Sequence, residues 1–357
     1  MTEAEAMERA LGLAWGGWGR VHPNPLVGAV VLQGGETVGE GYHAEFGGAH
    51  AELAALAQAG PRARGATMIV TLEPCRHHGK QPPCVDAIVA SGIRRVVFGA
   101  SDPNPAAGGG AAWLAAAGLD VAALPVTGAV ADQNAAFFHE FRERDRPWVA
   151  LKLATSLDGR IADYTGRSRW ISGPEARQWV HWLRSGFDAL AVGGRTARAD
   201  NPSLTVRGPV TPRLVPRRVV FDRRAELAGA QKLLDSARQI PVLVVAEGPV
   251  DTERAHALTA AGVDLLPVAN LHEGMVRLRE AGIRSLLVEG GGRLAGRLVA
   301  QGLVDRFYWV QGPVWLGDDG IPAFGGIPGG LLEQAVRWRV VERRPLGPDT
   351  LLALDRD

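Results

Sequence analysis

The chain of 357 residues is long enough for about two domains, and with 46% hydrophobic and 22% charged residues it has the composition of a folded globular protein. Its 39 lysines and arginines against 38 aspartates and glutamates leave a net charge of +1, which argues against a nucleic-acid binder. No apolar run is long enough to span a membrane, and the polar, acidic N-terminus does not resemble a signal peptide, so we expect a cytoplasmic protein.

The first part of the chain alternates helix and strand patterns. Thr2 and Glu5 have the spacing of a capping box, which predicts a helix that ends near Gly16. Further helices are predicted from Ala51, from Cys84 and over 111–117, and strands over 26–32, 37–42, 66–72, 94–99 and 121–124. This order predicts an α/β sandwich. The more polar stretch 127–146 predicts a connector helix and a boundary between domains 1–146 and 147–357.

A second alternating series follows the connector. Ser172 to Glu175 repeat the capping-box spacing with a proline in the first turn, which predicts a helix that ends near Ser185. Strands are predicted over 148–154, 189–193, 218–222, 242–246, 263–267 and 285–289. From Arg306 onward strand patterns recur without helices between them, which predicts antiparallel strands added at a sheet edge.

A zinc site of the deaminase type is the strongest motif in the first domain. His50 is followed by Glu52 two residues later, Cys75 follows a proline, and Cys84 lies behind it. A catalytic zinc takes three protein ligands and an open position for water, whose pKa it lowers toward ~7. Glu52 is two residues from the predicted ligand His50 and suits a proton shuttle between water and a departing amine. We expect one zinc per chain.

The segment between the two cysteines departs from the general deaminase signature. That signature has two residues between the cysteines, whereas residues 76–83 separate Cys75 from Cys84 here. The insert contains Lys80, one of only three lysines in a chain whose positive charge is otherwise arginine. A solvated surface loop is one interpretation. We favour an anion site, because an ammonium group is a point charge that suits phosphate. Lys80 is also a lysine in a chain that otherwise uses arginine almost throughout, which indicates a specific need for an ammonium at this position.

Two features of the second domain indicate a ligand site less strongly. The stretch 286–301 predicts a strand, a turn of three glycines and a helix, whose first N–H groups suit a cofactor phosphate. Such turns are common without a ligand, and this one is not the Rossmann pattern. Lys152 falls inside an apolar strand, where an ammonium is costly unless a ligand or a carboxylate pairs with it. We expect Asp200 and Glu289 near Lys152, although a lysine at a strand end that reaches solvent is the alternative.

These motifs, taken together, resemble one family. The matching segments are His22-Pro23-Asn24-Pro25, His50-Ala51-Glu52, Thr71-Leu72-Glu73-Pro74-Cys75, His77-His78-Gly79, Pro82-Pro83-Cys84, Asp102-Pro103-Asn104-Pro105, Lys152–Arg160, Trp170-Ile171-Ser172, Ala199–Arg207 and Glu289–Gly296. They occur in order over nearly the whole chain and resemble the bifunctional deaminase–reductase of riboflavin biosynthesis. The resemblance implies a cytidine-deaminase-like α/β/α sandwich followed by a dihydrofolate-reductase-like α/β domain.

The resemblance also implies two consecutive reactions. The first is hydrolytic deamination of 2,5-diamino-6-ribosylamino-4(3H)-pyrimidinone 5′-phosphate, with zinc on His50, Cys75 and Cys84 and with Glu52 as proton shuttle. The second is reduction of the ribosyl chain of 5-amino-6-(5-phosphoribosylamino)uracil to ribityl by NADPH. The implied partners are therefore small phosphorylated pyrimidines, with neither nucleic acid nor membrane. We expect a homo-oligomer, and specifically a dimer.

The remaining site residues are carried over position by position. In the deaminase half the substrate contacts are Asn24, His43, His77, Lys80, Asp102 and Asn104. In the reductase half the substrate contacts are Ser168, Arg184, Leu204, Arg207 and Glu289. The cofactor contacts are Ala154, Trp170, Thr196, Asp200, Gly291, Gly292, Arg293, Leu294, Ala295, Gly296 and Arg297. Lys152, Asp200 and Glu289 are the catalytic candidates of the reductase.

Two departures from the family pattern bear on these contacts. Arg223 stands where the family has a small residue, which puts a hydroxyl contact to the cofactor in doubt but could supply a cation for a 2′-phosphate. Residues 106–110 lack the valine and the basic residue often seen there, so one phosphate or sugar contact of the deaminase differs.

We predict NADPH rather than NADH as the cofactor, since a carboxylate at the adenosine ribose would repel the added phosphate. Arginines near the glycine turn could pair with that phosphate, and we favour Arg195 or Arg223 over Arg198 and Arg293. Surface charge from a GC-rich genome is the alternative origin of each of these arginines.

Two other function classes stay open at this point. One is a nucleic-acid deaminase with an accessory domain, against which the near-neutral charge and the long cysteine spacing count. The other is a deaminase whose second domain is only structural, against which Lys152, Asp200 and the glycine turn count.

Overall fold

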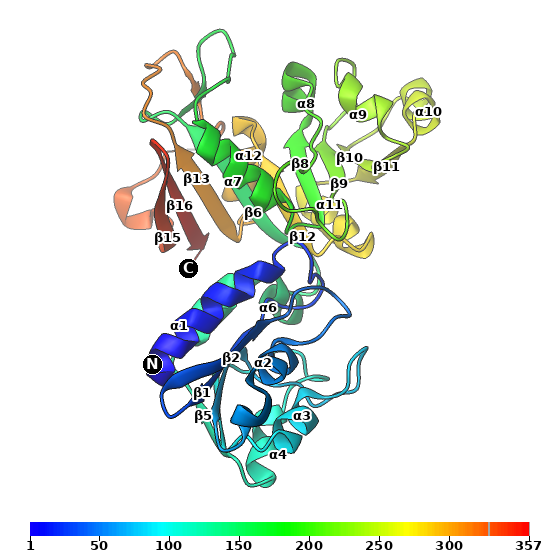
Figure 1. Ribbon diagram of the computed structural model, residues 1–357. Coiled ribbons are helices and arrows are strands. Elements are labelled where there is room, and N and C mark those ends of the chain that lie inside the picture. The colour runs from blue at the N-terminus through cyan, green and yellow to red at the C-terminus, as the bar shows by residue number, and fades with distance from the viewer. Residues whose placement is uncertain (328, 357) are drawn as a thin grey trace. The chain divides into compact units, whose positions relative to one another are not determined.

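The computed structural model describes residues 1–327 and 329–356, and the chain divides into two compact units (Figure 1). The first unit comprises residues 1–142 and the second begins at Glu143, just before the predicted boundary at residue 146. None of the described helices combines the length and the apolar character that a membrane crossing requires.

The first unit is a five-stranded sheet with helices on both faces (Figure 1), which confirms the predicted sandwich. The strand order is β2-β1-β3-β4-β5, and β1 is antiparallel to both of its neighbours whereas β3, β4 and β5 are parallel. Met68, Val70 and Val96 pack on one face of the sheet, while Ile69 and Val97 pack on the other, as the two-residue period of a strand requires. The strands are β1 (Gly28–Gln33), β2 (Glu36–Tyr42), β3 (Thr67–Leu72), β4 (Arg95–Ala100) and β5 (Asp120–Ala123).

The helices of the first unit lie close to their predicted positions. They are α1 (Glu3–Ala14), α2 (Ala51–Ala59), α3 (Cys84–Ala90), α4 (Gly110–Ala116), α5 (Thr127–Gln133) and α6 (Ala135–Arg142). The predicted capping box is present, because the Thr2 side chain accepts from the Glu5 N–H and Glu5 accepts from the Thr2 N–H.

The stretch predicted as one connector helix is instead two helices, α5 and α6, that belong to the first unit. Val130 and Phe138 pack with Leu72 and Ala100 in a buried cluster. Asn134, between the two helices, accepts from the Leu26 N–H at 2.7 Å and donates to the Leu26 carbonyl at 3.0 Å. The stretch is polar because its outer face is solvated, while its inner face completes the core of the first unit.

The second unit contains a nine-stranded sheet of order β11-β10-β9-β8-β12-β6-β13-β16-β15. The strands from β11 to β13 are parallel, and β16 and β15 are antiparallel additions at one edge. The predicted antiparallel tail is therefore correct for β15 and β16 but wrong for β13, which runs parallel to β6. The strands are β6 (Trp148–Thr155), β8 (Ala189–Gly193), β9 (Arg217–Phe221), β10 (Val242–Glu247), β11 (Val263–Val268), β12 (Ser285–Glu289), β13 (Arg306–Gln311), β15 (Trp338–Leu346) and β16 (Asp349–Arg356). A separate short pair joins β7 (Arg160–Ala162) and β14 (Ile321–Pro322).

Six helices accompany this sheet among the described residues. They are α7 (Pro174–Arg184), α8 (Gly194–Asp200), α9 (Gln231–Asp235), α10 (Thr252–Ala260), α11 (Leu271–Glu280) and α12 (Gly292–Ala300). The capping residue predicted for α7 is wrong, since the N-cap is Gly173 and no side-chain cap is present. The Gly173 backbone N–H donates to Asp349 Oδ2 at 2.7 Å, so a carboxylate far along the chain accepts the N-cap N–H, as Glu175 would accept that of Ser172 in the predicted capping box.

Candidate active sites

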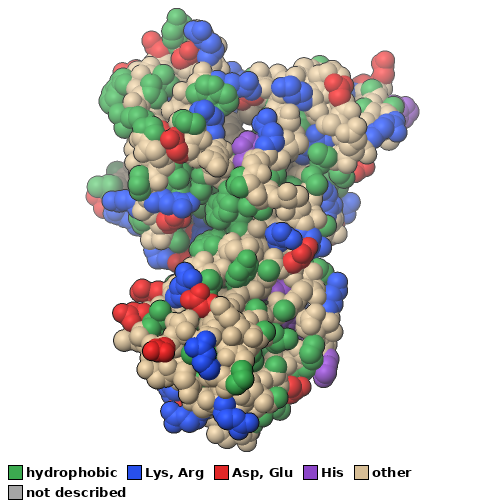
Figure 2. Space-filling view, viewed as in Figure 1, with side chains coloured by type: hydrophobic (Ala, Val, Ile, Leu, Met, Phe, Trp, Pro, Cys, Tyr) green, Lys and Arg blue, Asp and Glu red, His purple; other side chains and the backbone are tan. Residues whose placement is uncertain are grey.

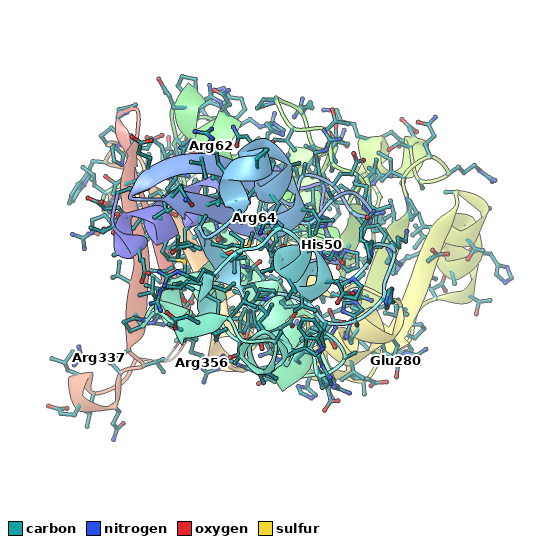
Figure 3. The ribbon with its side chains drawn as sticks, turned by 60° about the horizontal axis from the view of Figure 1, so that its bottom comes forward. His50, Arg62, Arg64, Glu280, Arg337 and Arg356 are labelled. Carbon is teal, nitrogen blue, oxygen red and sulfur yellow. The ribbon has the colours of Figure 1, made fainter. Side chains whose placement is uncertain are left out.

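Three side chains from separate elements of the first unit meet in one cluster. His50 immediately precedes α2 (labelled in Figure 3), Cys75 follows β3, and Cys84 is the first residue of α3. The His50 Nδ1 lies 3.1 Å from the Cys84 Sγ and 3.5 Å from the Cys75 Sγ. All three ligand atoms lie within 4.8 Å of one another, so one metal ion could reach each of them.

The donor set and its electrostatics suit zinc. One imidazole nitrogen and two sulfurs form a three-ligand set of the kind that leaves a fourth position open. Hydrogen bonds from Cys84 and then from His50 lower the pKa of the Cys75 thiol to about 4, so a thiolate is favoured here. Cys75 and Cys84 are both buried and pack against the buried Ala107.

Glu52 lies in the first turn of α2, two residues after His50. The side chain is 4% exposed, and burial raises the pKa of its carboxyl group. A raised pKa brings a carboxyl group closer to the range in which it both takes up and releases a proton, which suits proton transfer.

His43 and Asn24 form a hydrogen-bonded pair beside the cluster. The His43 Nδ1 lies 3.0 Å from the Ala49 carbonyl, which can only accept, so this nitrogen carries the proton. The other nitrogen, Nε2, then accepts from Asn24 Nδ2 at 3.1 Å. Burial lowers the pKa of His43, and its ring lies edge-on to that of His50 with centroids 5.3 Å apart. The neutral ring is thus held in one tautomer next to the metal ligand.

Two loops carry the other predicted substrate contacts of the first unit. The exposed Lys80 places its Nζ 4.2 Å from the centre of the Phe46 ring, a cation–π contact that fixes the ammonium without neutralising it. Burial raises the pKa of Asp102 to about 6, and its Oδ1 accepts from the Asn104 N–H at 2.8 Å. The Nδ1 of His77 is buried without a hydrogen-bond partner in the described structure. The anion site proposed for Lys80 stays a prediction.

The second unit contains a cavity of about 1720 Å³ at the carboxyl ends of its parallel strands. Figure 2 shows this unit hollowed on the drawn face, with Lys and Arg side chains around the hollow. Ligands of open α/β sheets bind at this end of the strands. The predicted residues that line the cavity are Lys152, Ala154, Ser168, Trp170, Arg184, Thr196, Asp200, Leu204, Arg207, Glu289, Gly291, Gly292, Arg293, Leu294 and Arg297.

Two predicted cofactor contacts do not line this cavity. Ala295 is fully buried in the hydrophobic core. Gly296 faces backbone, because a Cβ there would come within 2.2 Å of the Gly325 carbonyl oxygen. The helical period explains both positions. Arg293 and Arg297, four residues apart, face the cavity, whereas Ala295 and Gly296 lie on the other side of α12.

Glu289 is the carboxylate next to Lys152. The two residues are partners in the register between β12 and β6. Burial lowers the pKa of Lys152, while the charge of Glu289 opposes that effect and the charge of Arg184 adds to it. Asp200 lines the same cavity, but its neighbour is Arg169, whose Nη2 donates to the Asp200 carbonyl at 3.0 Å. Burial raises the pKa of the Asp200 carboxyl group.

The arginines around the cavity fall into two groups. Arg198 pairs with Asp222, and Arg297 pairs with both oxygens of Glu247 at 2.8 and 2.5 Å. Within the described chain the side chains of Arg195, Arg223 and Arg293 are exposed and form no hydrogen bond or ion pair. These three guanidinium groups line the cavity and keep all of their donors available for a phosphate.

Sequence reasoning missed two features of this site. The helix α8, which carries Thr196 and Asp200, was not predicted, because seven residues with glycine at the start show no amphipathic period. His181 also lines the cavity, and its Nδ1 accepts from the Arg207 N–H at 3.1 Å. His181 lies three residues before the predicted substrate contact Arg184, so the helical period places both on one face of α7, and this spacing could have predicted it.

Comparison with known proteins gives consistent matches over both units. Residues 1–100 match the cytidine and deoxycytidylate deaminase zinc-binding region, and residues 147–352 match the RibD C-terminal domain. The chain is 38% identical to riboflavin biosynthesis protein RibD of Aquifex aeolicus, over 98% of this chain and 97% of that protein. It is 38% identical to the RibD protein of Escherichia coli over 99% of both chains.

Solved structures agree with these matches. A diaminohydroxyphosphoribosylaminopyrimidine deaminase/5-amino-6-(5-phosphoribosylamino)uracil reductase from Thermotoga maritima superposes with a TM-score of 0.82 at 34% identity, covering 99% of both chains. RibD of Acinetobacter baumannii, form 1, gives a TM-score of 0.82 at 33% identity, again covering 99% of both chains.

Proposed function

Since the chain belongs to the RibD family of bifunctional deaminases and reductases of riboflavin biosynthesis, we propose how its residues divide the two reactions. The family's first domain has a cytidine-deaminase-like fold with a zinc-binding region, and its second domain is a dihydrofolate-reductase-like reductase that uses a nicotinamide cofactor. The meeting of His50, Cys75 and Cys84 from three separate elements is the observation that carries the proposal.

In the deaminase, one zinc per chain would be held by His50, Cys75 and Cys84. When bound, the metal supplies a Lewis acid that makes a water molecule nucleophilic at neutral pH. Glu52 would take a proton from the attacking water and give it to the departing amine, so that ammonia leaves and a carbonyl replaces the amino group. The buried carboxyl next to the cluster supports this role.

The pyrimidine phosphate would be held by the polar groups around the cluster. We assign the substrate contacts to Asn24, His43, His77, Lys80, Asp102 and Asn104. His43, with its proton on Nδ1 and its pKa lowered by burial, would orient Asn24. Lys80 would meet the 5′-phosphate as a point charge.

In the reductase, NADPH would lie along the carboxyl ends of the strands, and its nicotinamide supplies the hydride. Ala154, Trp170, Thr196, Asp200 and the start of α12 line this region and are the proposed cofactor contacts. Ser168, Arg184, Leu204, Arg207 and Glu289 would hold the phosphoribosyl substrate. Lys152 would donate a proton or hydrogen bond where charge develops as the sugar is reduced, and the charge of Glu289 opposes the lowering of its pKa by burial.

We assign the 2′-phosphate of NADPH to Arg195 and Arg223. Arg198 and Arg297 are paired with carboxylates, whereas Arg195 and Arg223 are unpaired and follow the ends of β8 and β9. Arg293, at the start of α12, is closer to the expected position of the pyrophosphate.

We also propose a homodimer formed through the sheet edge at β15. Among the described strands β15 pairs only with β16, so its outer edge offers unpaired backbone groups. Apolar side chains next to it are exposed, with Leu332 at 73%, Val336 at 62% and Val340 at 48%. Edge-to-edge pairing of two copies would cover both the backbone groups and these side chains. A Val340→Glu chain that still sediments as a dimer would exclude this edge.

Product analysis tests the overall function. The protein is incubated with the diaminopyrimidine phosphate, with and without NADPH. Without NADPH we expect ammonia and the ribosylamino uracil only, and with NADPH we expect the ribityl product. Deamination of RNA but not of the free pyrimidine phosphate would favour a nucleic-acid deaminase, and no change on adding NADPH would make the second unit a structural module.

A further inference from the structure

One buried carboxylate of the first unit accepts three backbone hydrogen bonds from a single loop. Glu73, directly after β3, is 8% exposed. Its Oε1 accepts from the N–H groups of Gly109 at 3.1 Å and Ala111 at 2.9 Å, and its Oε2 accepts from the Asp102 N–H at 3.2 Å. The loop 102–111, whose last two residues form the start of α4, is therefore held by Glu73 at both of its ends.

Arg76 holds the middle of the same loop. Its backbone N–H donates to the Ala107 carbonyl at 3.2 Å, and its side-chain Nε donates to the Gly108 carbonyl at 2.9 Å. Gly109, at a φ of +88°, leaves room for this guanidinium, because a Cβ there would lie 3.2 Å from the Arg76 Nε. Gly110 allows a still closer approach, since its Cβ would come within 1.8 Å of the Pro74 carbonyl oxygen.

The loop held in this way presents Asp102 and Asn104, two of the proposed substrate contacts. The backbone of the loop fixes the orientation of both side chains, because Asp102 Oδ1 accepts from the Asn104 N–H and Asn104 Oδ1 accepts from the Ala106 N–H. The four residues 73–76 also contain Cys75, a member of the metal cluster. One short segment thus connects the metal cluster to the loop that faces the substrate.

We infer that Glu73 and Arg76 are positioning residues of the deaminase, which set the loop 102–111, and with it Asp102 and Asn104, relative to the metal cluster. The inference rests on the proposed substrate contacts. Neither residue needs to touch the substrate, because their hydrogen bonds go to the loop backbone. Charged partners suit this task, since hydrogen bonds to an ionised group are stronger than neutral ones.

The first test is Glu73→Gln. A glutamine has a single side-chain oxygen. When this oxygen accepts the N–H groups of Gly109 and Ala111, the NH₂ group faces the Asp102 N–H, so two donors oppose each other and that hydrogen bond is lost. We expect the KM of the diaminopyrimidine phosphate to rise about tenfold or more. Zinc content and the NADPH-dependent activity of the same chain should stay unchanged, and amide hydrogen exchange should speed up within 102–111. The exposed Glu36→Gln is the matched control.

Arg76→Met is the second variant, with the exposed Arg62→Met (Figure 3) as its control. It removes one hydrogen bond, that to the Gly108 carbonyl, but does not set two donors against each other as Glu73→Gln does, so we expect a smaller rise in KM with zinc content unchanged. An unchanged KM in both Glu73→Gln and Arg76→Met would overturn the inference. Loss of zinc or of reductase activity in Glu73→Gln would also overturn it, because the residue would then maintain the metal cluster or the fold.

Asp102→Asn separates this inference from the proposed substrate contacts. If Glu73 acts through Asp102, the double variant should raise KM no more than the larger of the two single changes. Additive effects would mean that Glu73 does not act through Asp102. An unchanged KM in Asp102→Asn would contradict the substrate contact itself, whereas an effect of Asp102→Asn without one of Glu73→Gln would contradict only the positioning role.

Discussion

Arg184 and Glu289 form a bidentate ion pair in the second unit, with Nε 2.5 Å from Oε1 and Nη2 2.7 Å from Oε2. Arg184 is the last residue of α7 and Glu289 the last of β12. Lys152 lies next to Glu289 on β6, so two cations share one carboxylate. Burial raises the pKa of the Glu289 carboxyl group, but the charge and hydrogen bonds of Arg184, together with the charges of Lys152 and His181, lower this pKa below its ordinary value.

This arrangement predicts how the pH dependence of the reductase changes in Glu289→Gln. Burial lowers the pKa of Lys152, and the charge of Glu289 counteracts this. If reduction needs the protonated ammonium, activity falls as the pH rises through the pKa of Lys152. Removing the carboxylate lowers that pKa further, so the alkaline fall in kcat/KM should move to lower pH. The control is Glu280→Gln, at an exposed position, which should leave the pH profile of kcat/KM unchanged. If the alkaline fall in kcat/KM stays at the same pH in Glu289→Gln, Glu289 does not influence the protonation of Lys152.

Cys84→Ser should strip the metal from the first unit. A hydroxyl is a much poorer zinc ligand than a thiolate, and the remaining histidine and cysteine form an incomplete set. We expect zinc content, measured by elemental analysis, to fall from one per chain to near zero, with loss of deamination. Reduction of the deaminated intermediate should continue. Full zinc occupancy in this variant would remove Cys84 from the ligand set.

Glu52→Gln should keep zinc but lose deamination. The amide has nearly the same shape as the carboxyl group but cannot carry a proton, and such transfers contribute about 10²–10⁴-fold in rate. We therefore expect kcat to fall by at least that order, with zinc content unchanged. Near-normal turnover would show that another group moves the proton.

Arg195→Ala and Arg223→Ala should narrow the preference for NADPH over NADH. Each removes an unpaired cation from the proposed 2′-phosphate region, and a charge-assisted hydrogen bond contributes about 1.5–3 kcal/mol. We expect kcat/KM for NADPH to fall by about tenfold or more, while that for NADH changes little. Arg277→Ala, which breaks a surface ion pair with Glu280, is the control. Equal use of both cofactors by the unmodified protein would defeat the arginine assignment.

Asp349→Ala should destabilise the second unit, whereas Ser172→Ala should not. Asp349 is 1% exposed and accepts the N–H of the α7 N-cap residue, while the Ser172 side chain forms no cap. Leaving this partly buried N–H without its acceptor costs about 1–3 kcal/mol of the free energy of unfolding. Urea unfolding of the two variants measures this difference. Equal stability would show that the distant carboxylate does not cap the helix.

Much of the fold was predictable because its signals are local. The alternation of strand and helix periods placed most elements within a few residues, and Thr2 with Glu5 predicted the cap that the structure contains. The metal cluster was predictable for a different reason. Zinc chemistry restricts the usable residue types so strongly that His50, Glu52, Cys75 and Cys84 identify the site by type and order alone.

Tertiary structure alone decided the features that depend on residues far apart in the chain. The acceptor of the α7 N-cap N–H is Asp349 and not a residue of the predicted capping box, and of the two carboxylates expected near Lys152 the strand register places Glu289 beside it. The same holds for the arginines considered for the 2′-phosphate, where Arg198 and Arg297 are paired with carboxylates while Arg195, Arg223 and Arg293 have no partner among the described residues.

The sequence by itself therefore determined the α/β class and the residue types of the metal site, because periodicity, turn chemistry and ligand preference act over a few residues. The two reactions followed from the resemblance of its motifs to a known family. The three-dimensional fold decided which charges are neutralised and which loop Glu73 holds in place. Hydrogen bonds and ion pairs form between groups about 3 Å apart, and sequence separation carries no information on that distance.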